Sequence, residues 1–263
     1  MEKHVTIQWR DLNLSAAIHY PPSYLEGGKS TYPVIIICHG FIGTKMGVNR
    51  LFVNASRELS QNEYVIVRFD YSGCGESEGY YGRNKIEDLI DQTVHVIDYV
   101  QTLPCIDRNN VLLIGHSLGG AVALLTAVKD ERVRNLVLWS AVGTPYQDIM
   151  NIIGIENATE MDINKEVEFQ GYLLRKEFFQ SLQRYEPIKC AMRFKGNVLV
   201  VHGDEDEEID VNHCIHYDAS FSRRRVGSCE KRIIKGACHT YSSNIVFNEL
   251  IKTTGEWVQK TPK

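Results

Sequence analysis

Residues 111–125 read VLLIGHSLGGAVALL. Four large apolar residues run up to a turn at Ser117, which has glycines at positions 115, 119 and 120 around it. A short continuous apolar run is typical of a strand covered on both faces, and the small residues after it suit a helix packed closely on a sheet. The stretch therefore predicts a strand, a sharp turn at Ser117 and a helix.

Ser117 lies in a G-x-S-x-G pattern between this expected strand and helix. In a nucleophile elbow the serine occupies a strained strand–helix turn, and its hydroxyl is exposed at the carboxyl end of the sheet. Side chains two positions away would crowd such a turn, which explains Gly115 and Gly119. The pattern alone recurs by chance, but its place between a strand and a helix favours a nucleophile.

The composition is that of an ordinary globular protein, with 263 residues, 43% hydrophobic and 24% charged. The net charge of −4 gives no electrostatic reason to expect nucleic acid or a membrane as a partner. No stretch approaches the roughly 18 apolar residues of a membrane span. Seven scattered cysteines suit free thiols in a reducing compartment, and the first residues lack the apolar segment of a signal peptide. We therefore expect a cytoplasmic protein.

Five continuous apolar runs indicate the strands of a mostly parallel sheet. Apolar residues at helical spacing lie between them, at 50–61, 85–101 and 119–129. This alternation predicts a doubly wound α/β fold with helices on both faces of the sheet. The first thirty residues predict an antiparallel hairpin at the sheet edge. The five runs are VIIIC (34–38), VIVRF (65–69), VLLI (111–114), LVLW (136–139) and VLVV (198–201).

The strand–helix rhythm is interrupted between Gly143 and Lys195, where no strong strand is expected. We predict an α/β core from 1–142 and 196–263, with 143–195 as a lid insertion, here called the lid segment. Its helix either docks on the core or covers a site with its apolar face, and the sequence leaves both open. That helix is expected over 171–185, with an apolar stripe of Leu174, Phe178, Leu182 and Tyr185.

A nucleophile elbow predicts an acid and then a histidine further along the chain. Acidic residues at 204–208 and 210 follow the run VLVV, and His239 precedes the last helical segment. A serine hydroxyl is a weak nucleophile near neutral pH, so it needs a base that accepts its proton and returns it to the leaving group. A carboxylate would fix the tautomer of that imidazole. His239 is the histidine with the right chain position.

An oxyanion hole is also required, because negative charge develops on the carbonyl oxygen under attack. One donor is expected from the backbone N–H of Leu118, the residue after the nucleophile. The other is expected from the loop after an early strand, in VIIICHGFIG, where Phe41 follows His39 and Gly40. Both donors are backbone groups, so their side chains can vary.

Five segments of the chain resemble the α/β-hydrolase fold family, and their order and spacing resemble its small cinnamoyl/feruloyl-esterase-type carboxylesterases. The family pattern H-G-x-x-D-x-x-V falls on His202, Gly203, Asp206 and Ile209, which selects Asp206 as the acid. The resemblance implies cleavage of short-to-medium or aromatic acyl esters through an acyl-Ser117 intermediate, without cofactor or metal. The segments are HGF (39–41), RFDYSGCGESEG (68–79), GHSLGG (115–120), HGDEDEEI (202–209) and GACHTYS (236–242).

Two departures from that subgroup weaken a specific claim for hydroxycinnamates. Leu118 stands where many feruloyl esterases carry glutamine, and Leu173 aligns with a lid position that is often tyrosine. We therefore expect an esterase of small-molecule substrates first and a feruloyl esterase second. A thioesterase, a lysophospholipase-like lipase, a peptidase or a non-catalytic binding protein of the same fold are the alternatives, and a homodimer is left open.

Two other candidate motifs each lack a glycine that they require. The segment YSGCGESEG is no dinucleotide loop, because Glu78 stands where G-x-G-x-x-G needs its last glycine. The acidic run from Asp204 is no EF-hand loop, because Ile209 occupies the sixth position.

Overall fold

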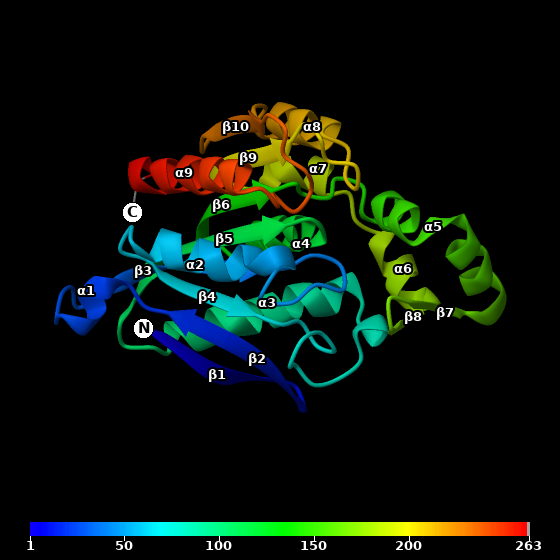
Figure 1. The fold of residues 1–263 in the computed structure, drawn as a ribbon, viewed down its shortest axis with the longest axis horizontal. Coiled ribbons are helices and arrows are strands. Elements are labelled where there is room, and N and C mark those ends of the chain that lie inside the picture. The colour runs from blue at the N-terminus through cyan, green and yellow to red at the C-terminus, as the bar shows by residue number, and fades with distance from the viewer. Residues whose placement is uncertain (262–263) are drawn as a thin grey trace.

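The computed structural model describes residues 1–261, with side chains at all of these positions except 158 and 161–163. An eight-stranded, mostly parallel sheet forms its centre (Figure 1). β1 and β2 form an antiparallel hairpin at one edge, β2 pairs antiparallel with β4, and every later pair is parallel. In spatial order the strands are β1 (Glu2–Trp9), β2 (Leu12–His19), β4 (Val65–Phe69), β3 (Tyr32–Cys38), β5 (Ile106–His116), β6 (Val133–Trp139), β9 (Asn197–Gly203) and β10 (Cys229–Ile234).

Each central strand buries side chains on both faces, which is why its sequence reads as a continuous apolar run. In β3, for example, Ile36 belongs to one hydrophobic core and its neighbours Ile35 and Ile37 belong to the other. The alternation repeats in β5, where Leu113 and Leu112 face opposite cores. The sheet is therefore the middle of three layers.

Helices cover both faces of the sheet. α2 (Leu51–Ser60) and α9 (Asn244–Lys260) pack on one face, and α3 (Ile86–Gln101), α4 (Leu118–Lys129) and α8 (Asn212–Phe221) pack on the other (Figure 1). α4 is almost wholly buried, as its small apolar residues predict. The short helix α1 (Pro22–Leu25) precedes β3, and α7 (Pro187–Cys190), although within the range of the lid segment, contacts α4 and α8. No helix in the range 1–261 has both the length and the apolarity to cross a bilayer.

The five predicted strands, the three predicted helices and the edge hairpin are confirmed. β10 was not expected, because its sequence CEKRII carries charged residues at exposed positions. It lies at the other edge of the sheet and pairs only with β9, so it needs no continuous apolar run.

The lid segment contains α5 (Pro145–Asn164), the hairpin β7 (Glu166–Phe169) and β8 (Tyr172–Arg175), and α6 (Lys176–Leu182). These elements lie beyond the carboxyl ends of the parallel strands, to the right in Figure 1. The expected helix over 171–185 is wrong in its first half, because that half pairs with β7 as a strand. The expected core from 196–263 ends with two residues outside the described range, and the division into core and lid stays a prediction.

Candidate active site

Ser117, Asp206 and His239 reach one edge of the sheet because each follows a parallel strand. Ser117 follows β5, Asp206 lies in the loop after β9, and His239 lies in the loop between β10 and α9. The carboxyl ends of parallel strands meet at the same edge, and ligands bind there in open α/β sheets. Residues far apart in sequence are thereby brought to one place.

Ser117 occupies a strained turn, with φ 56° and ψ −129°. A non-glycine residue in such a conformation costs roughly 1–3 kcal/mol unless its surroundings hold it in place. Its N–H donates to the carbonyl of Trp139 at 3.0 Å, and its own carbonyl accepts from Val142 at 3.0 Å. The chain around β6 therefore fixes the turn that presents the hydroxyl.

The glycines around Ser117 are required by close backbone approach. A Cβ on Gly115 would lie 2.3 Å from the carbonyl oxygen of Gly119, and one on Gly119 would lie 2.2 Å from the carbonyl oxygen of Cys38. A Cβ on Gly40 would lie 2.9 Å from the Cβ of Ser117. The close packing around Ser117 therefore leaves no space for side chains at these glycines of its own turn and of the loop after β3.

Asp206 and His239 form a buried pair. The Nδ1 atom of His239 donates to Oδ2 of Asp206 at 2.8 Å, and neither side chain is more than 6% exposed. Asp206 Oδ2 also lies 3.1 Å from Nε2 of His202. Its other oxygen accepts the backbone N–H groups of Glu208 and Ile209 at 3.0 and 2.9 Å. The carboxylate is thus fully hydrogen-bonded and holds the imidazole by one nitrogen.

The ionisation of Asp206 follows from these contacts. Burial alone would raise the pKa of its carboxyl, but hydrogen bonds from His202 and His239 and a positive charge on His239 hold that pKa well below its usual range. Asp206 is therefore a carboxylate at neutral pH. A carboxylate that accepts from Nδ1 leaves Nε2 of His239 as the nitrogen that can accept a proton.

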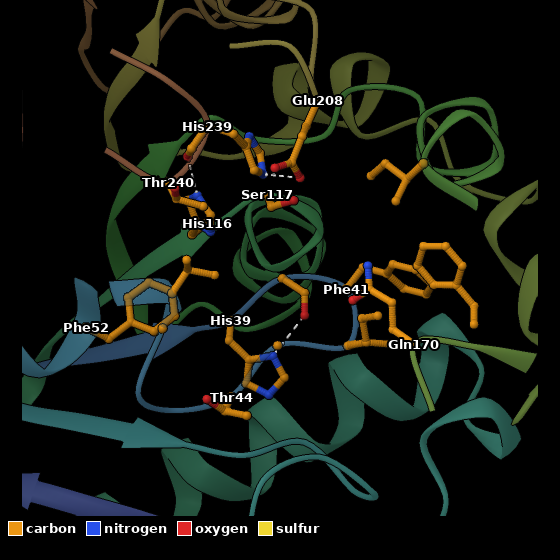
Figure 2. A pocket seen from close by; sticks show the side chains of 17 residues that line it. His39, Phe41, Thr44, Phe52, His116, Ser117, Gln170, Glu208, His239 and Thr240 are labelled. Carbon is orange, nitrogen blue, oxygen red and sulfur yellow. Dashed lines mark hydrogen bonds and ion pairs between the residues drawn. The ribbon is translucent and has the colours of Figure 1, made fainter. Parts of the chain in front are cut away.

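Ser117 and His239 line the same cavity (Figure 2). The serine hydroxyl lies beneath the imidazole ring in this view. Among the described residues no hydrogen bond joins the two side chains. Such bonds in catalytic sites are often long and tighten only when substrate binds.

The loop after β3 carries Phe41, the second predicted oxyanion donor. His39 fixes its start, because Nδ1 of His39 donates to the carbonyl of Gly40 at 2.9 Å and Nε2 accepts the N–H of Tyr71 at 3.0 Å. Burial lowers the pKa of His39 to about 4, which keeps the ring neutral. Leu118 is the first residue of α4, where N–H groups have no partner within the helix. Leu118 thus directly follows Ser117 and Phe41 lines the same cavity, and the role of their N–H groups as oxyanion donors stays a prediction.

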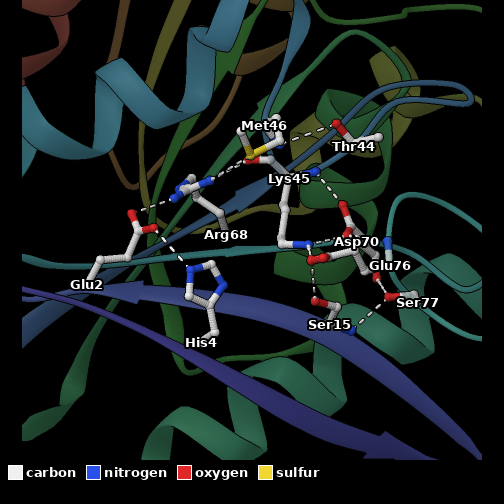
Figure 3. A network of polar contacts seen from close by, with 10 residues as sticks. All are labelled: Glu2, His4, Ser15, Thr44, Lys45, Met46, Arg68, Asp70, Glu76 and Ser77. Atoms are coloured by element: carbon white, nitrogen blue, oxygen red, sulfur yellow. Dashed lines mark hydrogen bonds and ion pairs between the residues drawn. The ribbon is translucent and has the colours of Figure 1, made fainter.

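A buried ionic network anchors the loop after β3, which carries Phe41 (Figure 3). Lys45 Nζ lies 2.6 Å from carboxylate oxygens of Asp70 and of Glu76, and Lys45 and Asp70 are at most 5% exposed. The backbone N–H of Lys45 donates to Asp70, and its carbonyl accepts from Arg68 at 2.9 Å. Arg68 in turn pairs with Glu2 at 2.7 Å. The loop is therefore anchored to the end of β4 by charge as well as by backbone bonds.

The cavity beside Ser117 has a volume of about 440 Å³ and draws its walls from three parts of the chain. The loop after β3 supplies Phe41, and the lid segment supplies Ile152, Phe169 and Gln170. Phe41 stacks on Phe169 with ring centroids 6.1 Å apart. The cavity is thus largely apolar on the lid side. On the opposite side, Glu208 lies next to His239.

Sequence reasoning assigned no role in the site to Glu208, His116 or His202. Only distances reveal them, since His116 and His202 act on the backbone and carboxylate of other residues. Leu173, aligned above with a lid tyrosine, is 53% exposed and is not among the residues that line the cavity. Among the side chains that the structure describes, no group of three or more His, Cys, Asp or Glu is placed to hold a metal ion.

Comparison with known proteins agrees with this fold. A profile described as the alpha/beta hydrolase fold matches residues 33–186, which is more than half of the chain. The chain belongs to the alpha/beta hydrolase fold family. The matched range of this hydrolase includes Ser117 and the loop after β3, and it ends before Asp206 and His239.

Solved structures match the hydrolase over nearly its whole length. Est1E from Butyrivibrio proteoclasticus, solved with ferulic acid bound, has a TM-score of 0.84 and 21% identity and is covered over 98% of both chains. Alpha/beta hydrolase domain-containing protein 10 from mouse has a TM-score of 0.77 and 18% identity, over 98% of this chain and 99% of that one. At such identities the likeness shows the fold.

Sequence relatives match shorter stretches. An uncharacterized 31.7 kDa protein in the traX-finO intergenic region of Escherichia coli is 36% identical over 110 residues, which are 42% of this chain and 37% of that protein. Lysophosphatidylserine lipase ABHD12 from Xenopus tropicalis is 35% identical over 100 residues, 38% of this chain and 24% of the lipase. The hydrolase therefore matches well under half of the length of these relatives.

Proposed function

We propose that this hydrolase cleaves carboxylic esters through an acyl-Ser117 intermediate. The 2.8 Å hydrogen bond between His239 Nδ1 and the carboxylate of Asp206, together with the cavity that His239 shares with Ser117, carries the proposal. That bond leaves Nε2 of His239 free to take the serine proton, which a serine needs in order to attack a carbonyl.

The proposed reaction has two halves. Ser117 Oγ bonds to the ester carbonyl carbon while its proton passes to His239. The oxyanion that forms accepts hydrogen bonds from the backbone N–H groups of Phe41 and Leu118. The intermediate collapses, the alcohol leaves with the proton from His239, and the acyl group stays on Ser117. Water then repeats the sequence and releases the acid.

The cavity walls support an apolar acyl group. Phe41, Ile152 and Phe169 line the lid side, so a short-to-medium alkyl chain or an aromatic ring finds apolar contacts there. Ferulic acid, found bound to Est1E, is an aromatic acid of the kind that such walls suit. We therefore place aliphatic and cinnamoyl esters together in the proposed substrate class.

The test is a hydrolysis panel with Ser117→Ala beside wild type. It holds p-nitrophenyl acetate, butyrate and octanoate, methyl ferulate, an acyl-CoA, a lysophospholipid and an aminoacyl anilide. We expect wild-type ester cleavage that Ser117→Ala abolishes with an unchanged circular-dichroism spectrum. Ser222→Ala is the matched control, because Ser222 is exposed at the end of α8.

A fluorophosphonate probe gives a second readout of the nucleophile. The intact mass of the wild type and of Ser222→Ala should increase by one adduct, and that of Ser117→Ala should not change. Full activity in Ser117→Ala would exclude Ser117 as the nucleophile. Silence of the folded wild type on every substrate, without labelling, would favour a binding protein. A preference for the acyl-CoA, the lysophospholipid or the anilide would favour a thioesterase, a lipase or a peptidase.

A further inference from the structure

The cavity beside Ser117 has an uneven charge. Among its described lining residues Glu208 is the one carboxylate, and none is a lysine or an arginine. Burial lowers the pKa of His39 to about 4, and burial together with a positive charge on His239 lowers that of His116 to about 3, so both rings are neutral at pH 7. A substrate in this cavity therefore meets a negative charge with no fixed positive charge to offset it.

Glu208 lies beside the proposed proton donor to the leaving alcohol. Its Oε2 atom is 3.8 Å from Nε2 of His239. In the proposed reaction this nitrogen delivers a proton to the leaving alcohol, so the alcohol oxygen must come within hydrogen-bond reach of it. Figure 2 shows the Glu208 carboxylate beside His239 and Ser117, and Phe41 and Gln170 on another side of the cavity. The acyl and alcohol portions thus meet different surroundings.

The surface next to this position is also acidic. A neighbouring depression is lined by Glu205, Glu207 and Glu208 together with Cys238, His239 and Thr240. The buried carboxylate of Asp206 differs from these, because His202 and His239 both lie within hydrogen-bond distance of it. Of the three exposed glutamates, only Glu208 also lines the Ser117 cavity, so it is the carboxylate that a bound ester meets.

We propose that Glu208 is a specificity-determining residue that favours esters with a positively charged alcohol portion and disfavours those with a negatively charged one. The favoured class carries a quaternary ammonium or a protonated amine, and the disfavoured class carries a phosphate, a sulfonate or a coenzyme A moiety. This inference rests on the ester hydrolysis proposed above. It refines that proposal, because it concerns the alcohol side and leaves the acyl side apolar.

The expected effect is moderate. The Glu208 side chain is 54% exposed, so water and salt screen its charge. Interactions between partly exposed charges a few ångströms apart alter rates by about three- to tenfold for each substrate charge. When a cation is compared with an anion the two effects multiply, to a ratio of about ten- to hundredfold, and 0.5 M NaCl reduces that ratio.

The experiment uses three butyrate esters that share one acyl group: butyrylcholine, its uncharged isostere 3,3-dimethylbutyl butyrate, and 2-sulfoethyl butyrate. Acid release is followed by pH-stat titration with wild type, Glu208→Gln and Glu207→Gln. Glu207 is the matched control, because it is an exposed neighbour that does not line the Ser117 cavity. The measured quantity is the ratio of kcat/KM for the cation to that for the anion, which cancels any change in His239 common to all substrates.

We expect Glu208→Gln to lower this ratio at least tenfold, Glu207→Gln to lower it less than twofold, and salt to lower it only in the variants that keep Glu208. An unchanged ratio in Glu208→Gln, with the neutral ester still cleaved, would overturn this inference and leave the proposed function standing. An equal loss in Glu207→Gln would overturn it too, because the effect would belong to the whole surface. Failure of wild type on all three esters and on the earlier panel would overturn the proposed function itself.

Discussion

The Nε2 atom of His116 donates a 2.8 Å hydrogen bond to the backbone carbonyl of His239, so the residue before the proposed nucleophile holds the loop of the proposed base. The two imidazole rings also lie 4.8 Å apart, centroid to centroid. Burial is the largest cause that lowers the pKa of His116, to about 3, so its ring is neutral at pH 7 and adds no positive charge beside His239. We therefore expect His116 to act as a positioning residue for His239.

We expect His116→Leu to lower kcat about five- to tenfold with little change in KM, since one hydrogen bond is worth about 1 kcal/mol. His116→Gln should recover most of the loss, because its amide nitrogen can reach the same carbonyl. Steady-state kinetics of both variants on p-nitrophenyl butyrate provide the measurement. Equal losses in the two variants would show that the ring matters and the hydrogen bond does not.

The stability of the hydrolase should fall as the pH is lowered from 6.5 toward 4. Burial lowers the folded-state pKa of His39 and of His116 to about 4 and about 3, from 6.5. Below pH 6.5 the unfolded chain therefore binds protons that the folded chain does not, and each histidine removes up to about 1.4 kcal/mol of unfolding free energy per pH unit. Asp206, whose pKa is lowered, contributes stability that is lost only below its usual pKa of 3.8.

Urea unfolding at half-unit steps between pH 7 and 4.5 measures this slope. His39→Gln should have a shallower slope by about one proton, even where its absolute stability is lower. His216→Gln, at an exposed position of α8, should keep the wild-type slope. Parallel curves for wild type and His39→Gln would show that His39 takes up its proton in the folded state as readily as in the unfolded one.

Lys45 should be needed for both stability and turnover. Its ammonium lies 2.6 Å from Asp70, and removing one partner of a buried ion pair typically costs about 3–5 kcal/mol. Lys45→Met leaves Asp70 without its lysine and frees the loop that carries Phe41. We expect a lower urea midpoint and a lower kcat, with Lys235→Met, at an exposed position, equal to wild type in both. A Lys45→Met protein as stable as wild type would mean that backbone bonds alone anchor the loop.

Local apolar patterns explain why most of the fold could be predicted. Strands such as β3 are buried on both faces, so every residue from Val34 to Cys38 reports the same environment. Over 171–185, by contrast, the spacing of the apolar residues led to a wrong prediction. Leu174, Phe178 and Leu182 are all buried at a spacing of four, as in a helix, yet pairing with β7 makes Tyr172–Arg175 a strand. Tertiary pairing overrode a periodicity that fits both structures.

Some residues of the candidate site could likewise be predicted from the sequence, and others could not. Ser117 is marked by glycines whose crowding is a local property of its turn, and Asp206 and His239 follow from chain order and family pattern. The charge of Glu208 beside His239 could not be predicted, because its position depends on how the loop after β9 folds around Asp206. The anchoring of the loop after β3 by Lys45 likewise joins residues that are separate in sequence.

Asp206 and Asp204 should differ sharply, although both lie in one acidic run. In Asp206→Asn the amide oxygen can still accept the N–H groups of Glu208 and Ile209, so the NH2 group faces the nitrogen of His239 that now donates. Two donors cannot pair, and His239 must adopt the other tautomer, with its proton on Nε2. We expect kcat to fall on the order of 10⁴-fold, as in other triads, with unchanged folding.

Asp204 is the internal control for this assignment. It is exposed, and its Oδ1 atom accepts the N–H of Gly236 at 2.6 Å, a bond that asparagine can keep. Asp204→Asn should therefore retain activity within about twofold, since no hydrogen bond to an ionisable group is lost. A severe loss of activity in Asp204→Asn beside a mild one in Asp206→Asn would identify Asp204, rather than Asp206, as the acid of the site. The 2.8 Å bond to His239 would then be a structural contact rather than part of the proton transfer.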